Sequence, residues 1–177
     1  MKIEFFALPE KTFLDFYDAF VLDEEECKGA RPPAFFEDLE KMGLDFDEWY
    51  HCAPLYERLS PDLPSLSFEQ ALRLLEGMEG KALFLSEPLK RTPLGGLTVK
   101  GRTFHDYVAM ADPRELSAQI LLQCKHPEGV CDELILPPDL YVFDPCFERL
   151  LVIVGSAPSP SGNGAPLCKA FGFEGLC

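Results

Sequence analysis

LYVFDPCFERLLVIV, residues 140–154, constrains the architecture of this 177-residue chain more than any other segment. Two β-type runs, 141–143 and 149–154, flank the sequence DPCF at 144–147, a combination that is typical of a turn between strands. The spacing therefore predicts an antiparallel β-hairpin over 140–154. Residues 150–154 are apolar without interruption, which is typical of a central strand buried on both faces of a sheet.

Helical and β-type patterns surround this hairpin. Helices are predicted over 11–22, over 34–42 with Gly43 as a cap, after Asp45 up to Pro54, behind a Ser67–Gln70 capping box, from Thr103, and from Pro113 to near Cys124. Short strands are predicted at 2–8, 81–86, 97–99 and 132–136. Helices gather in the first two-thirds of the chain and strands in the last third. The sequence therefore predicts an α+β fold, in which several helices pack on a mainly antiparallel sheet.

The ends of the predicted domain follow from composition. We expect a single α+β domain over 1–155 and a C-terminal tail over 156–177. Residues 156–164, SAPSPSGNG, are rich in Ser, Pro and Gly and indicate no regular structure. The tail beyond them carries Phe171 and Phe173, whose apolar side chains could dock on the domain.

Net charge narrows the classes of partner. The formal charge is −14, from 30 acidic and 16 basic residues, and 15 of the acids lie in residues 1–60. A negative field repels phosphate, so we expect no nucleic-acid partner and no membrane partner. It would attract a basic protein, although net charge also serves solubility alone, which is the interpretation we favour. The sequence does not determine the oligomeric state.

The cysteines and the N-terminus indicate a compartment. The chain has seven Cys at irregular spacing, and its first residues, MKIE, do not resemble an export signal. Both features favour reduced thiols and a cytoplasmic protein. The longest purely apolar run is 150–154, much shorter than the roughly 20 residues that span a bilayer.

No group of residues has the spacing of a known metal or catalytic motif. Cys124, His126 and Cys131, with a fourth ligand from His51-Cys52, could bind zinc, but the usual Cys pairs are missing. His105 has an acidic neighbour, yet adjacent residues on a helix point in different directions. We therefore predict no metal, no cofactor and no catalytic residue.

Two acidic runs are the most distinctive candidates for a binding site. The first follows the 11–22 helix, and because acids at a helix C-terminus oppose the helix dipole, we expect the helix to end near this run. The double proline at 32–33 then predicts an extended connector. The second run carries an aromatic residue of a type that often anchors interfaces. The predicted binding residues are Asp23, Glu24, Glu25, Glu26, Asp45, Asp47, Glu48 and Trp49. Amphipathicity alone explains the same pattern, with Trp49 in the core and the acids in solvent, and this is the interpretation we favour.

Three classes of function remain open. The one we favour is a small acidic, non-catalytic protein-binding domain, such as an inhibitor or immunity-type protein for a basic partner. One alternative is a small cytosolic enzyme that uses His105 or Cys52, and the other is a structural or accessory subunit of an oligomer. The negative charge and the small size of the chain support the binding-protein class, but no sequence motif specific to that class is present.

Overall fold

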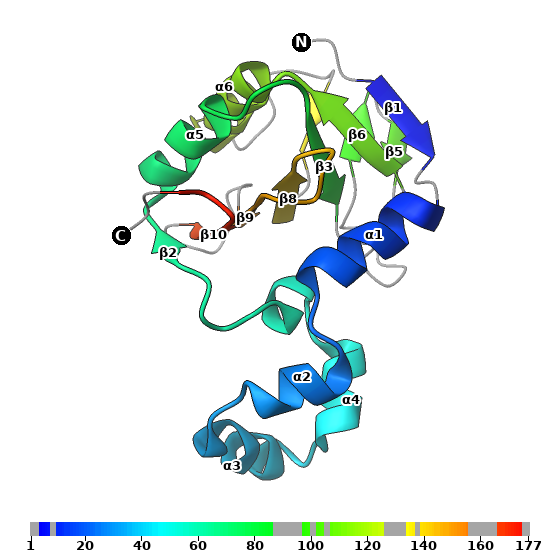
Figure 1. Cartoon of the computed structure of the whole chain (residues 1–177), viewed down its shortest axis with the longest axis vertical. Helices are drawn as coiled ribbons and strands as arrows, with labels where there is room; N and C mark the ends of the chain where they lie inside the picture. The colour runs from blue at the N-terminus through cyan, green and yellow to red at the C-terminus, as the bar shows by residue number, and fades with distance from the viewer. Residues whose placement is uncertain are drawn as a thin grey trace. The chain divides into compact units, whose positions relative to one another are not determined.

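The computed structural model describes residues 4–7, 10–86, 97–99, 102–104, 107–125, 134–136, 139–155 and 166–174. The chain divides into two compact units. We call residues 1–9 and 64–177 the sheet unit and residues 10–63 the helical unit (Figure 1). The predicted domain boundary at residue 155 stays a prediction.

The sheet unit is built on antiparallel strands. Its larger sheet, within the described residues, has seven strands in the order β1-β6-β3-β8-β9-β10-β2. They are β1 (Glu4–Ala7), β2 (Ser65–Leu66), β3 (Ala82–Ser86), β6 (Tyr107–Ala111), β8 (Asp139–Phe143), β9 (Leu150–Val154) and β10 (Leu167–Phe171). A smaller sheet has the order β5-β4-β7, with β4 (Leu97–Val99), β5 (Arg102–Phe104) and β7 (Leu134–Ile135). Neighbouring strands pair antiparallel in both sheets.

The predicted hairpin over 140–154 is confirmed. Strands β8 and β9 pair from Asp139 opposite Val154 to Phe143 opposite Leu150. The Asp144 carboxylate closes the turn by accepting hydrogen bonds from the backbone N–H groups of Glu148 and Arg149, at 2.9 and 2.7 Å. Strand β9 lies between β8 and β10 and is buried along its first four residues, as its uninterrupted apolar sequence predicts.

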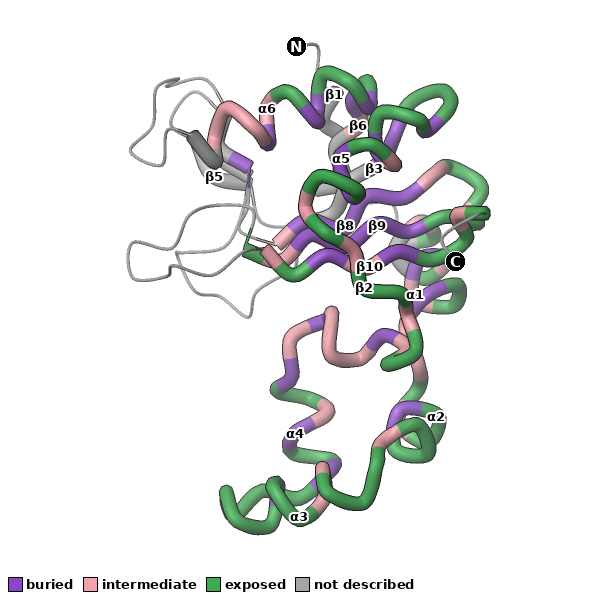
Figure 2. The backbone as a smooth tube through the Cα atoms, turned by 90° about the vertical axis from the view of Figure 1, so that its left-hand side faces the viewer, coloured by how far each residue is buried: buried purple, intermediate pink, exposed green. Residues whose placement is uncertain are grey.

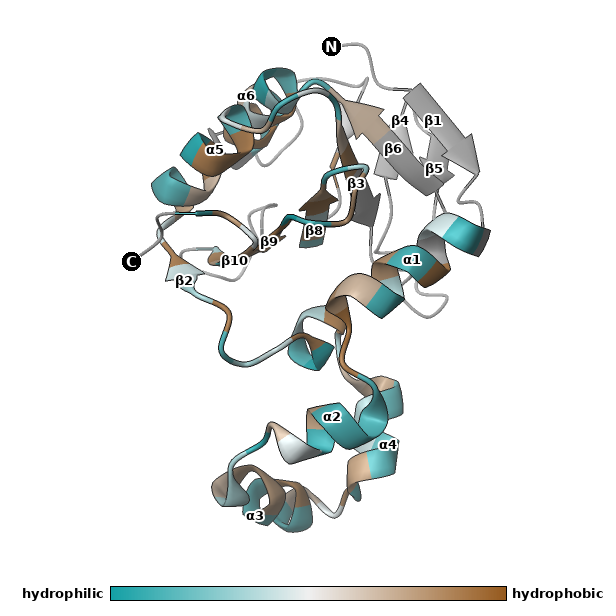
Figure 3. Ribbon diagram, viewed as in Figure 1, coloured by the Kyte–Doolittle hydropathy of each residue, from teal (hydrophilic) through white to brown (hydrophobic). Residues whose placement is uncertain are grey.

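Helices α5 (Phe68–Glu76) and α6 (Pro113–Lys125) share the core of the sheet unit. Ser67 caps α5, and its hydroxyl accepts the Gln70 N–H at 3.1 Å, which confirms the predicted capping box. Alternate strand residues meet the helices, as the period of a β-strand requires. This core includes Leu72, Leu75, Leu116, Ile120, Leu140, Val142, Leu151 and Ile153. Figure 3 shows β8 and β9 as hydrophobic and the outer side of α5 as hydrophilic.

The segment after residue 155 contains a strand. Strand β10 pairs with β9 on one side and with the short β2 on the other. Cys168 and Ala170 point into the core, whereas Phe171 is exposed. Phe173 is half-buried and packs against the same core. Of the two phenylalanines that we expected to dock, Phe173 therefore makes the contact with the core.

The helical unit has four short helices and a 3-10 turn among its residues. They are α1 (Glu10–Phe20), α2 (Glu24–Gly29), α3 (Pro33–Met42), α4 (Phe46–Cys52) and the 3-10 turn η1 (Leu55–Arg58). Gly43 ends α3 with a positive φ of 71°, as the sequence predicts. Cys27, Leu39, Phe46, Trp49 and Ala53 form a buried cluster in this unit. Among the described residues, no helix has the length and apolar character needed to cross a bilayer.

The helix predicted from Thr103 is wrong. Residues 102–104 form β5 and residues 107–111 form β6, which lies between β1 and β3 in the larger sheet. The apolar spacing fits a helix, but Tyr and Val favour strands, and pairing partners on both sides decide between the two. Both partners of β6 are distant in sequence, so a local pattern does not reveal them.

The acidic run after the 11–22 helix contains a helix that we did not predict, whereas Pro32 is extended, as the double proline predicts. Helix α1 ends at Phe20, as expected, but Glu24–Gly29 form a new helix, α2. Asp23 is the N-cap of α2, and the three glutamates that follow occupy its first turn. Acids at a helix N-terminus complement the dipole, so the run that opposes one helix stabilises the start of the next.

Candidate functional site

Two capping boxes build the candidate site. The Asp23 carboxylate accepts the Glu26 N–H at 2.8 Å, and the Glu26 carboxylate accepts the Asp23 N–H at 3.2 Å. At the start of α4, Asp45 and Glu48 make the same reciprocal pair at 2.8 and 3.3 Å. Each pair satisfies backbone donors that the first turn leaves free. Four of the eight predicted binding residues therefore fix the starts of α2 and α4.

Trp49 lies in the interior of the helical unit. It is 9% exposed and contacts Phe35 and Phe46, with ring centres at 4.8 and 5.3 Å. Its position matches the interpretation in which the indole belongs to the core and the acids of α4 face solvent. The seven acids among the eight predicted residues therefore remain as the candidates for a binding surface, and four of them are the capping residues.

The basic residues of the helical unit are already engaged. Lys11 pairs with Asp15 at 2.6 Å and Lys41 with Asp38 at 2.8 Å. The other three cations lie over aromatic rings, an arrangement that is attractive because the ring face is negative. Lys28 lies over Phe46, Arg31 over Phe35 and Trp49, and Arg58 over Tyr17 and Tyr50.

Three of the five acids on α2 and α4 take part neither in a capping box nor in an ion pair with a described Lys or Arg. Glu24 is half-buried, whereas Glu25 and Asp47 are exposed, as are most residues along α2 (Figure 2). No described Lys or Arg lies within ion-pair distance of any of the three. The helical unit holds 15 acidic and five basic residues, a net charge of −10. We call Glu24, Glu25 and Asp47 the acidic face.

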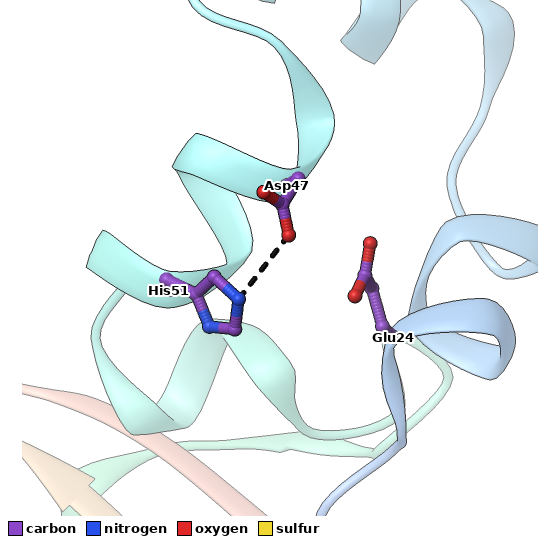
Figure 4. Close-up of side chains that lie close together, drawn as sticks. All are labelled: Glu24, Asp47 and His51. Carbon is purple, nitrogen blue, oxygen red and sulfur yellow. Dashed lines mark ion pairs between the residues drawn. The ribbon is translucent and has the colours of Figure 1, made fainter.

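One histidine lies beside this face. His51 Nε2 is 3.2 Å from an Asp47 carboxylate oxygen, four residues earlier on α4, and Glu24 approaches from α2 (Figure 4). One ligand atom from each of the three side chains lies within 4.8 Å of the other two. The i, i+4 spacing of Asp47 and His51 is visible in the sequence once a helix is predicted after Asp45. The approach of Glu24 is not, because it depends on the packing of α2 against α4.

The aromatic side of the same helices serves structure. The Tyr50 hydroxyl donates a hydrogen bond to the Leu22 carbonyl at 2.9 Å. Burial raises the pKa of Tyr50, and the nearby Arg58 guanidinium partly opposes that rise. The phenol therefore stays protonated and keeps its donor role at neutral pH.

The other candidates from the sequence are not brought together within the described residues. His105, His126 and Cys131 lie outside the described residues, and of Cys124 only its place in α6 is described. Cys52 ends α4 and is exposed. The zinc and enzyme interpretations that rest on these residues stay predictions.

Comparison with known protein families, with curated proteins and with solved structures found no match to this chain.

Proposed function

We propose that this chain is a non-catalytic, cytoplasmic binding protein, of the inhibitor or immunity type, whose acidic face on α2 and α4 covers a basic surface of a partner protein. The observation that carries the proposal is the meeting of Glu24 with Asp47 from two separate acidic runs. They meet in a unit whose five basic residues already have partners in that unit.

The charge distribution supports a site in the helical unit. This unit carries a net charge of −10 in 54 residues, whereas the remaining 123 residues carry −4. A concentrated field of one sign speeds the encounter with an oppositely charged surface and orients it. Association driven in this way weakens as salt rises, because the Debye length falls from about 30 Å at 0.01 M to about 3 Å at 1 M salt.

The two capping boxes pre-organise the acidic face. They hold the first turns of both helices without using Glu24, Glu25 or Asp47. A binding surface that is already ordered loses less conformational entropy on association. The acids to substitute in a test are therefore these three, because changing the capping residues would loosen the helices themselves.

The test is capture by the full chain from a lysate of cells that make it, at about 0.05 M and about 0.5 M salt. The E24Q/E25Q/D47N variant removes three charges from the acidic face. The matched control E37Q/D38N/E40Q removes three charges from exposed positions of α3. We expect one basic protein to bind the original chain and the control, to be lost at high salt, and to be lost from the first variant.

Two outcomes would contradict this proposal. One is equal capture by both triple variants, which would place the binding surface away from α2 and α4. The other is capture that does not change with salt, which would remove the electrostatic basis. Circular dichroism of each variant checks that the helices persist, because Glu24, Glu25 and Asp47 lie outside the caps but within the first turns of α2 and α4, where acids complement the helix dipole.

A further inference from the structure

We propose that Glu24, Asp47 and His51 form a binding site for a divalent transition-metal ion, with zinc as the best match, that links α2 to α4. The site goes beyond the proposed function and does not depend on it, but it shares Glu24 and Asp47 with the acidic face, so a bound metal ion and a basic partner would compete for these two carboxylates. It uses one nitrogen and two carboxylate oxygens, a donor set that zinc accepts in proteins.

The pair on α4 already has the spacing that a metal requires. Zinc binds His nitrogen and carboxylate oxygen at about 2.0–2.2 Å, so two of its tetrahedral ligands lie roughly 3.3 Å apart. His51 Nε2 and Asp47 Oδ1 are 3.2 Å apart. A metal can therefore replace the direct contact between these two atoms without moving the helix backbone.

Glu24 supplies the third ligand from the other helix. Its ligand atom lies within 4.8 Å of both the others, so closing the site requires an approach of up to about 1.5 Å. Asp47 and His51 are both largely exposed, and Glu24 is half-buried, so side-chain rotation can supply that approach. Figure 4 shows the Glu24 and Asp47 carboxylates turned toward each other, with the imidazole beside them.

The electrostatics of the cluster favour a cation. Two carboxylates at this distance repel each other, and an ion pair with His51 offsets one negative charge only when the imidazole is protonated. No described Lys or Arg pairs with Glu24 or Asp47. A divalent ion would neutralise the charge of both carboxylates. It would also bind the lone pair of a nitrogen of the neutral imidazole, which is a common metal ligand. Three protein ligands leave a fourth position for water.

The experiment measures zinc binding to the full chain, kept reduced, by isothermal titration calorimetry and by the metal-dependent rise in melting temperature. E24Q, D47N and H51Q each remove one ligand. E25Q is the matched control, because it removes the same charge from the next residue of α2 without removing a ligand. We expect each ligand variant to lose at least about tenfold in zinc affinity, since even the loss of an outer-shell partner costs 10–100-fold. E25Q should stay within about twofold, because it changes only a nearby charge.

The absorption spectrum of bound Co²⁺ distinguishes this site from a site formed by cysteines. Co²⁺ at a site of nitrogen and oxygen ligands gives visible d–d bands without the intense near-ultraviolet absorption of a thiolate complex. We expect the original chain to show such bands and the H51Q chain to lose them. Zinc binding with equal affinity in E24Q, D47N, H51Q and E25Q, or d–d bands that stay the same in H51Q, would overturn the proposal. So would the absence of measurable binding to the original chain.

The outcomes also separate this site from the proposed partner surface. H51Q leaves the three charges of the acidic face in place, so it should lose zinc but still capture a basic protein. E25Q retains all three ligands and should keep zinc. If partner capture fails in every form of the chain while the ligand variants lose zinc, the metal site stands and the proposed function falls.

Discussion

The guanidinium carbon of Arg31 lies 4.9 Å from the centre of the Trp49 ring and 5.0 Å from that of Phe35. The same guanidinium group donates a hydrogen bond to the backbone carbonyl of Glu57 and approaches Cys27 Sγ at 3.9 Å. A single half-buried cation therefore ties together α2, α3, α4 and η1. Its planar shape allows it to contact two rings and still donate, which a lysine ammonium cannot match.

Arg31→Ala should destabilise the helical unit by about 1–3 kcal/mol, because it removes two ring contacts and a hydrogen bond to a part-buried carbonyl. Trp49 is the sole tryptophan of the chain, so its fluorescence during chemical denaturation reports on this unit. The control is Lys41→Ala, which removes an exposed cation from a surface pair and should cost about 0.5 kcal/mol or less. Equal losses in the two variants would show that neither the ring contacts of Arg31 nor its hydrogen bond to Glu57 stabilises the unit.

Gly172→Ala should destabilise the sheet unit far more than Gly80→Ala. Both glycines have nearly the same positive φ, 75° and 76°, so both variants incur the cost of a left-handed conformation, about 1–2 kcal/mol. At Gly80 a Cβ meets nothing within 4 Å, whereas at Gly172 it overlaps the Glu148 carbonyl oxygen. Overpacking adds about 1–3 kcal/mol for Gly172→Ala. Denaturation followed by far-ultraviolet circular dichroism measures the difference, and equal stability of the two variants would contradict the close approach.

Much of the fold follows from local sequence. The hairpin over 140–154, the Ser67 capping box and the Gly43 cap each depend on residues a few positions apart, and all three are confirmed. The strands at 102–104 and 107–111 could not be predicted in this way, because the pairing of β6 with β1 and β3 outweighs a local helical pattern. The start of α2 at Asp23 could have been predicted from the sequence, because acids that oppose the dipole at the end of one helix favour the first turn of the next.

The candidate site was predictable only as a list of acids. The sequence contains both acidic runs and the Asp47–His51 spacing, yet nothing local distinguishes the capping acids from the exposed ones before the helix starts are known. Asp23 and Asp45 form caps, whereas Glu24 and Asp47 meet at the surface. Their meeting depends on how α2 packs against α4, where Cys27 of α2 shares a buried cluster with Phe46 and Trp49 of α4.

Thiol reactivity should follow burial. Cys52 and Cys146 are exposed, whereas Cys27 and Cys168 are buried in the cores of the two units. In the folded chain, iodoacetamide should modify the first two on the order of ten times faster than the last two, since a buried thiol reacts only when its surroundings open. Peptide mapping by mass spectrometry measures each rate, and labelling in denaturant is the control. Fast modification of Cys27 in the folded chain would contradict the packing of α2 against α4.

The open end of the hairpin carries a carboxyl group with a perturbed pKa. Asp139 begins β8, opposite Val154, and its carboxylate accepts the Gly155 N–H at 3.2 Å. Burial raises the pKa of Asp139 above its ordinary 3.8, and the Gly155 hydrogen bond partly opposes that rise. The folded chain therefore retains this proton at a pH where the unfolded chain has lost it.

Asp139→Asn should make the sheet unit more stable than the original chain at neutral pH. At a pH between the ordinary pKa of 3.8 and the raised pKa, the folded state holds more protons on Asp139 than the unfolded state does. The contribution of Asp139 to the free energy of unfolding therefore falls as the pH rises through that range. Asparagine cannot ionise, yet its side-chain oxygen still accepts the Gly155 N–H. The advantage of the variant should shrink as pH falls through the raised pKa toward 3.8. Urea denaturation of both chains across that range measures it, with Asp62→Asn as a control that removes the same charge from an exposed position. An advantage independent of pH would mean that burial of the charged carboxylate is not its cause.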